Sequence, residues 1–214
     1  MSIGVAFRDS DIPKFLASEP TWTQRLGDGW KGVKFLGKGS FGVVGLWRYE
    51  GEEGPNAPEV REVVVKQSNL YLNHNVEPLF GMTGLDEGQM LEKLSKTGSQ
   101  HIIRQYGGFH TGDRFGDMDQ VVKLFLEYCP GGDVDQLLAG VDRNGNQLPR
   151  KPPIGEADLW ALFTCMALGV VVMHRGTEVT SEPAWGGQYL LQRVETEICH
   201  FDIKPDNRES ILFF

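Results

Sequence analysis

Three glycines near the N-terminus have the spacing of a phosphate-binding turn. They are Gly37, Gly39 and Gly42, in the stretch Gly-Lys-Gly-Ser-Phe-Gly. Glycine lets a backbone turn tightly and approach a phosphate without a Cβ in the way. Strand-like residues lie on both sides of the stretch, whereas a dinucleotide-binding turn lies between a strand and a helix. A glycine-rich hairpin that binds no ligand fits the same pattern, so the turn alone does not define a site.

Other residues with chemical potential follow along the chain. Lys66 ends the apolar run Val63-Val64-Val65, and Glu87 begins a segment with apolar residues at helical spacing. The stretch 200–207 places a carboxylate, an ammonium group and an amide close together in the sequence. A lone lysine at the end of an apolar strand is usually a solvated strand end, so Lys66 also depends on its context.

Hydrophobic patterning predicts the elements that must position these residues. The strand-like segments are 33–49, which contains the glycine turn, 60–67, 101–109 and 121–128, and the first helical segment is 85–94. The later segments are a short helix at 133–139, a loop at 142–153, a long apolar helix at 156–175 and a polar, irregular segment at 177–197. Five strands and one helix therefore precede a mainly helical part.

Taken in order, five motifs over residues 31–207 resemble those of eukaryotic protein kinases. They are the glycine turn, Val63–Lys66, Glu87, the hinge-like Leu126-Glu127-Tyr128-Cys129-Pro130-Gly131-Gly132-Asp133, and His200-Phe201-Asp202-Ile203-Lys204-Pro205-Asp206-Asn207. Lys204, two residues after Asp202, resembles Ser/Thr kinases more than Tyr kinases. Phe201 and the segment 177–197 resemble a divergent fungal group of the family.

The resemblance implies a role for each matched residue. The residues implied to bind ATP are Gly37, Gly39, Gly42, Val44, Val64, Lys66, Glu87, Glu127, Cys129 and Asp133. In the implied phosphoryl transfer Asp202 takes the hydroxyl proton, Lys204 neutralises charge, and Asn207 binds Mg²⁺.

Glu87 is implied to pair with Lys66 and to position it. Glu92 competes for this role. It lies five residues further on, so both carboxylates cannot point at Lys66 from one straight helix.

The chain also departs from the family pattern. Phe201 replaces an Arg that pairs with a phosphate on the activation loop, so this switch is expected to be absent. Val64 replaces a smaller Ala and narrows the adenine slot. Charged residues at 208–209 fall where the family has an apolar strand, and burying them costs several kcal/mol unless they are paired. No Asp-Phe-Gly follows. The chain as written is therefore expected to be truncated and to have little kinase activity.

Composition narrows the class of partner and the cellular location. A formal net charge of −8 argues against a general nucleic-acid binder. The three cysteines form no Cys-x-x-Cys pair, which indicates reduced thiols rather than a disulfide framework or a zinc site. The N-terminus lacks the pattern of a secretory signal. The longest apolar stretch, 159–173, is interrupted by Thr164 and Gly169 and is expected to be too short to span a bilayer. A cytoplasmic or nuclear protein without membrane association is expected.

These observations predict an α+β, protein-kinase-like fold. Residues 1–28 are expected to form an N-terminal extension before the first strand, with Pro13 and Pro20 as breakers of regular structure. Residues 29–128 are expected to form an N-lobe with a five-stranded antiparallel sheet and one helix, and residues 129–214 the hinge and a partial, mainly helical C-lobe. The expected function is ATP- and Mg²⁺-dependent phosphoryl transfer to Ser/Thr of a protein substrate. The alternative is a catalytically inactive nucleotide-binding or interaction fragment, or a mispredicted gene product.

Overall fold

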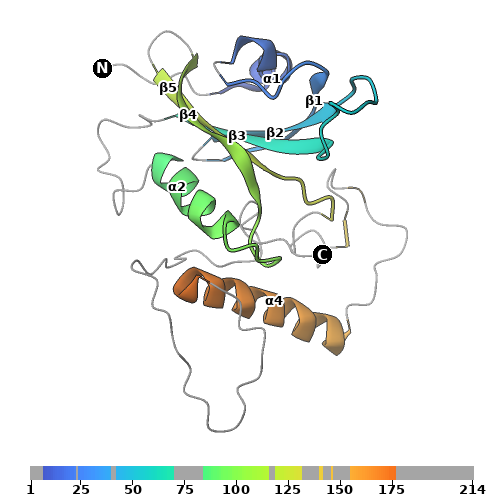
Figure 1. Ribbon diagram of the computed structural model, residues 1–214, viewed down its shortest axis with the longest axis vertical. Coiled ribbons are helices and arrows are strands. Elements are labelled where there is room, and N and C mark those ends of the chain that lie inside the picture. The colour runs from blue at the N-terminus through green and yellow to red at the C-terminus, as the bar shows by residue number, and fades with distance from the viewer. Residues whose placement is uncertain are drawn as a thin grey trace. The chain divides into compact units, whose positions relative to one another are not determined.

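The structure, a computed structural model, has α+β architecture with one five-stranded antiparallel sheet (Figure 1). It describes residues 7–22, 24–39, 42–69, 84–115, 119–131, 140–141, 146 and 155–176. The chain divides into two compact units, which are Met1–Glu92 with Arg104–Tyr128 and Lys93–Ile103 with Cys129–Phe214.

The sheet belongs to the first unit and has the strand order β1-β2-β3-β5-β4. Its strands are β1 (Trp30–Gly39), β2 (Gly42–Tyr49), β3 (Glu62–Asn69), β4 (Gln105–Phe115) and β5 (Asp119–Glu127). All neighbouring strands are antiparallel. The prediction of five strands and an antiparallel sheet is thus confirmed, with a shift at β4, which begins four residues later than expected.

Both faces of the central strands are buried. Because side chains alternate across a strand, the pairing of Val44 with Lys66 and of Lys66 with Leu124 places these three on one face. The neighbouring residues Val43, Val65 and others point to the opposite face. The side chains of that opposite face form an apolar cluster of Val43, Trp47, Val63, Val65 and Phe125, together with Phe15 and Trp22. The run Val63-Val64-Val65 is apolar throughout, because its side chains alternate between two buried faces.

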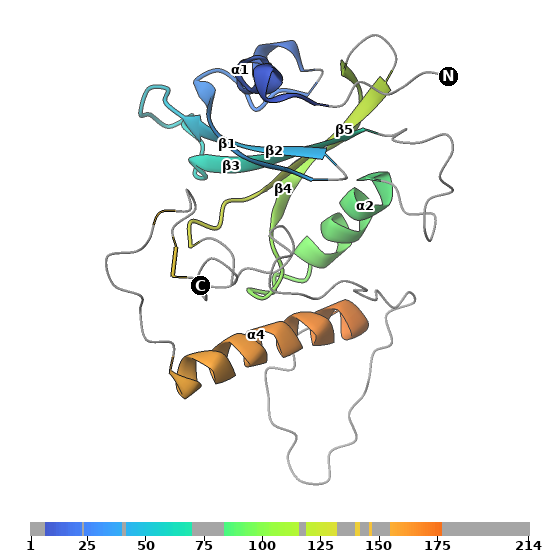
Figure 2. The same cartoon turned by 180° about the vertical axis from the view of Figure 1, so that it is seen from behind.

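The N-terminal segment, defined here as residues 7–22 and 24–28, covers this apolar cluster. It contains η1 (Asp9–Asp11), α1 (Ile12–Leu16) and η2 (Glu19–Thr21). Figures 1 and 2 show α1 on one side of the sheet and α2 (Gly84–Ser95) on the other. No helix was predicted in the N-terminal segment, since Pro13 and Pro20 were interpreted as breakers. Both prolines lie in the first turn of their helices, where the missing N–H costs no hydrogen bond.

The helix α2 confirms the predicted helix at 85–94. Its residues up to Glu92 belong to the first unit, and those from Lys93 onward belong to the second. In the second unit Leu94 packs with Ile102, Val172 and Met173.

The helix α4 (Glu156–Arg175) matches the predicted bounds. Asp158 accepts a hydrogen bond from the Gly155 N–H at 2.8 Å at its start, and Gly176 ends it in the left-handed conformation with φ 72°. By length and composition α4 is able to cross a membrane. The helix is longer than the apolar stretch 159–173, for which too short a span was expected. The core helix of a soluble protein has the same length and composition. The predicted helix at 133–139 and the irregular segment at 177–197 lie outside the described residues.

Candidate functional site

The glycine turn joins β1 to β2 and lies beside β3. Gly39 ends β1 opposite Gly42, which begins β2. A Cβ at Gly42 would collide with the carbonyl oxygen of Gln67 on β3. Gly42 is therefore required by the close approach of two strands, whether or not a ligand binds. At Gly37, by contrast, an added Cβ would meet no atom of the described residues within 4 Å. The side of Gly37 on which a Cβ would stand is therefore free of the described atoms.

Lys66 and Glu87 form an ion pair beside this turn. The distance between Lys66 Nζ and Glu87 Oε1 is 2.9 Å, and the Lys66 side chain is only 8% exposed. β3 supplies the lysine and α2 supplies the glutamate, as the sequence predicted. The predicted ion pair of Lys66 with Glu87 is thus confirmed.

The register of the sheet fixes Lys66 close to the glycine turn. Lys66 pairs with Val44, which is two residues after Gly42. Its ammonium group donates a hydrogen bond to the Glu87 carboxylate. The site thus places a cationic side chain close to a glycine-rich turn. A buried ion pair need not stabilise the fold much, because the desolvation cost offsets the attraction.

An apolar surface continues from Lys66 across the same face of the sheet. It consists of Val44, Leu46, Val64, Leu124 and Leu126, all less than a tenth exposed. Val44 and Val64, both predicted to bind ATP, are neighbours of Lys66 on this face.

The hinge-like residues lie at the end of β5. The Glu127 N–H donates to the Arg104 carbonyl at 2.8 Å, and the Glu127 carboxylate accepts from the Arg104 N–H at 3.2 Å. Cys129 is half-buried and belongs to the second unit.

The remaining predicted site residues are Asp133, Asp202, Lys204 and Asn207, which lie outside the described residues. Within the described part of the chain, no three His, Cys, Asp or Glu side chains gather as metal ligands. The structure therefore describes Gly37, Gly39, Gly42, Lys66 and Glu87 of the predicted site, and the roles of Asp133, Asp202, Lys204 and Asn207 stay predictions.

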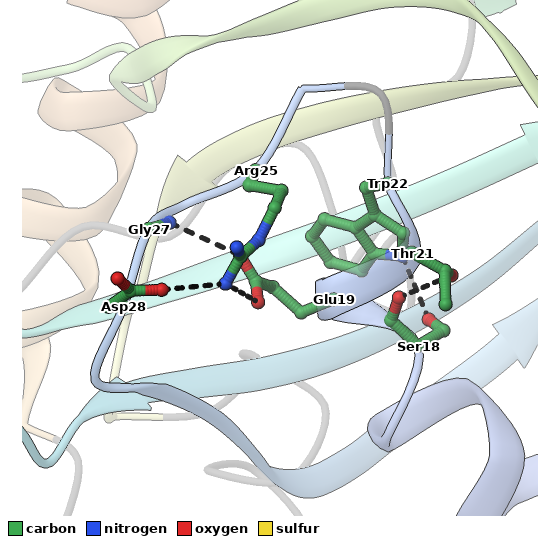
Figure 3. Close-up of polar contacts among 7 residues, drawn as sticks. All are labelled: Ser18, Glu19, Thr21, Trp22, Arg25, Gly27 and Asp28. Atoms are coloured by element: carbon green, nitrogen blue, oxygen red, sulfur yellow. Dashed lines mark hydrogen bonds and ion pairs between the residues drawn. The ribbon is translucent and has the colours of Figure 1, made fainter.

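Sequence reasoning missed a polar cluster in the N-terminal segment (Figure 3). The Glu19 carboxylate is buried, and it accepts hydrogen bonds from the Gly27 N–H at 3.1 Å and from Arg25 at 3.4 Å. The hydrogen bond from Arg25 to Glu19 and the charge of this carboxylate raise the pKa of Arg25 above its ordinary value. The cluster closes the loop that leads from η2 into β1.

The N-terminal segment also binds the sheet through aromatic and cationic contacts. The Trp22 ring lies 5.1 Å from Trp47 and 5.9 Å from Phe125, between ring centroids. The Lys123 ammonium, in a residue 1% exposed, lies 5.2 Å from the Trp22 centroid. The signal in the sequence was the density of large aromatic residues, which a segment outside the core does not need.

Comparisons with known proteins do not assign the chain to a family. No family model matches it, and a search of curated proteins found no match either.

Proposed function

We propose that this chain is a protein-kinase-like nucleotide-binding module whose function is ATP-dependent phosphoryl transfer to Ser/Thr of a protein. The observation that supports this best is the Lys66–Glu87 ion pair, which lies beside the glycine turn. Its Nζ and Oε1 atoms are 2.9 Å apart. A glycine-rich hairpin without a ligand has no need of a buried lysine held at its side. The order of strand, turn, strand and helix that the motifs require also agrees with the observed elements.

Each described residue has a defined part in this proposal. Lys66 binds the α- and β-phosphates, and Glu87 keeps its ammonium group at that position. Gly37 and Gly39 let the backbone N–H groups approach the phosphates, and Val44 and Val64 contact the adenine ring. Burial strengthens the attraction between Lys66 and a phosphate, because water screens it less there.

The transfer step would use the stretch 200–207. Asp202 accepts the proton of the substrate hydroxyl, Lys204 neutralises charge on the transferring phosphoryl group, and the Asn207 amide oxygen binds Mg²⁺. When bound, Mg²⁺ neutralises the charge of the phosphates. The protein's part in such a transfer is mainly positioning and electrostatic stabilisation.

A second candidate function is an interaction module that does not catalyse transfer. It is favoured by the exposed large apolar side chains of α4, which are Leu159, Trp160, Phe163 and Val170. The two candidates differ in whether phosphate reaches a protein substrate.

Isothermal titration of ATP with Mg²⁺ tests the binding step. We expect binding by the full chain, its loss in Lys66→Met, and weaker binding in Glu87→Gln. Lys31→Met is the matched control, because it breaks another 2.9 Å ion pair of the same sheet, with Glu50, on the surface. Equal ATP affinity in Lys66→Met and Lys31→Met, or no binding by the full chain, contradicts the proposal.

Phosphate incorporation into generic Ser/Thr substrates tests the transfer step. Incorporation that is lost in Asp202→Asn supports the kinase function. Binding of ATP without any incorporation supports the second candidate instead.

A further inference from the structure

We propose that the N-terminal segment is a positioning strap for the glycine turn, with Asp9 acting through Lys38 as a positioning residue. This inference rests on the proposed function, because it concerns regulation of the same nucleotide site. The strap holds the turn in advance of binding, so that less conformational freedom is lost when a nucleotide binds.

The N-terminal segment contacts β1 at the start, the middle and the end of the strand. At the start of β1, an added Cβ at Gly32 would collide with the Leu16 carbonyl oxygen. At its middle, the Phe7 and Phe35 rings stack with centroids 5.9 Å apart and planes at 10°. At its end, Asp9 Oδ1 lies 2.8 Å from Lys38 Nζ. The contacts thus extend along the strand into the glycine turn itself.

The N-terminal segment is anchored to the sheet by two buried aromatic side chains. Phe15 and Trp22 are 3% and 5% exposed and belong to the apolar cluster of the sheet. The ring centroid of Phe15 lies 5.2 Å from that of Trp47. A tether restrains its far end only when its near end is held, and these two aromatic residues provide that hold.

Asp9 contacts the glycine turn from the face of the sheet opposite Lys66. Lys38 pairs with Val43, whose side chain belongs to the cluster beneath the N-terminal segment. Gly37 pairs with Val44, on the same face as Lys66. Because directly paired residues share a face, Asp9 holds the turn from behind. The strap thus lies on the face opposite Lys66, so it positions the turn and does not compete with the nucleotide.

The pair between Asp9 and Lys38 is exposed, with side chains 82% and 49% accessible. Exposed ion pairs have small effects, and we expect Asp9→Asn to weaken ATP binding about two- to fivefold. Because the cluster of Phe15 and Trp22 is untouched, the thermal midpoint should change little. This difference separates a positioning role from a merely structural one.

The test combines ATP titration with amide hydrogen exchange of the full chain. Asp9→Asn should speed exchange at residues 34–39 and leave β3 and β5 unchanged. Charge reversal in Asp9→Lys should do the same, and adding Lys38→Asp should restore both exchange and affinity. Glu50→Gln is the control, since it breaks the 2.9 Å pair with Lys31 at the other end of the same hairpin.

The outcomes separate this inference from the proposed function. Unchanged exchange and affinity in Asp9→Asn, or no rescue by the double reversal, overturns the strap while the proposed function stands. If the full chain binds no ATP, the proposed function fails and the nucleotide role of the strap fails with it. Faster exchange confined to 34–39 would then show only that the segment restrains β1.

Discussion

The central sheet and helix α4 are both rich in large apolar side chains, yet they differ in what covers them. In the sheet, Trp47, Val65 and Val122 are at most 1% exposed, because each face has a covering layer. On α4, Trp160 and Phe163 are 61% and 62% exposed, and Val172 and Met173 at its other end are buried. Apolar composition predicts that a segment packs against other apolar side chains, but it does not show which part of the chain provides them. The partner of the sheet is a segment that the sequence pattern did not predict to be structured.

The comparison predicts very different costs for the same substitution at two tryptophans. Trp22→Ala should destabilise the fold by about 3–5 kcal/mol, because it removes a core aromatic residue and leaves a cavity. Trp160→Ala should change the free energy of unfolding by less than about 0.5 kcal/mol. Urea denaturation of both variants measures this. Similar losses at the two positions would mean that α4 is covered in solution or that the N-terminal segment is not docked.

A second prediction concerns the uncovered side of α4. We expect the isolated chain to self-associate through it, since burying one Phe side chain contributes about 1.5–3 kcal/mol. Phe163→Glu should therefore weaken association about tenfold or more, as measured by sedimentation equilibrium.

The control for this prediction is Ala157→Glu, which adds the same charge at an exposed position in the first turn of α4. It should leave the association constant nearly unchanged. A monodisperse monomer at high concentration in the unaltered chain would contradict the prediction.

The smallest expected effect tests how firmly the covering layer is closed. Glu19→Ala should cost about 1–2 kcal/mol, because the Gly27 N–H and the Arg25 guanidinium lose a buried acceptor. Glu19→Gln keeps an acceptor and should cost less. Asp28→Asn, which alters the other carboxylate on Arg25, should have no measurable effect, because the Asp28 side chain is 99% exposed. Thermal denaturation ranks the three, and a larger loss for Asp28→Asn than for Glu19→Ala would reverse the assignment.

Local patterns in the sequence were sufficient for most of the sheet and for both long helices. Alternation and β-branched runs predicted β1, β2, β3 and β5, and helical spacing predicted α2 and α4. β4 was placed too early because Ile102 and Ile103 look like strand residues. Ile102 instead packs with Leu94, Val172 and Met173. Ser99 accepts a hydrogen bond from the His101 N–H and holds that stretch in a turn.

The candidate site was predictable where motifs followed one another in the order of a known family. Lys66 and Glu87 were paired through the resemblance to protein kinases, with Glu92 as the competitor, and the structure confirms the pair of Lys66 with Glu87. The N-terminal segment could not be predicted in the same way. Its contacts join Phe7, Phe15 and Trp22 to strands far away in the sequence, and three residues spaced so widely do not define a helix or a strand by their pattern.

The stacking of Trp22 on Phe125 has a consequence for how the chain folds during synthesis. Trp22 leaves the ribosome more than a hundred residues before Phe125, so the covering layer is made long before its surface is complete. Contacts between such distant residues form slowly, because a long loop must close first. Until β5 has been synthesised, the aromatic residues of the N-terminal segment remain available to other apolar surfaces. The aromatic side chains of the N-terminal segment are therefore exposed in the nascent chain until β5 completes the sheet.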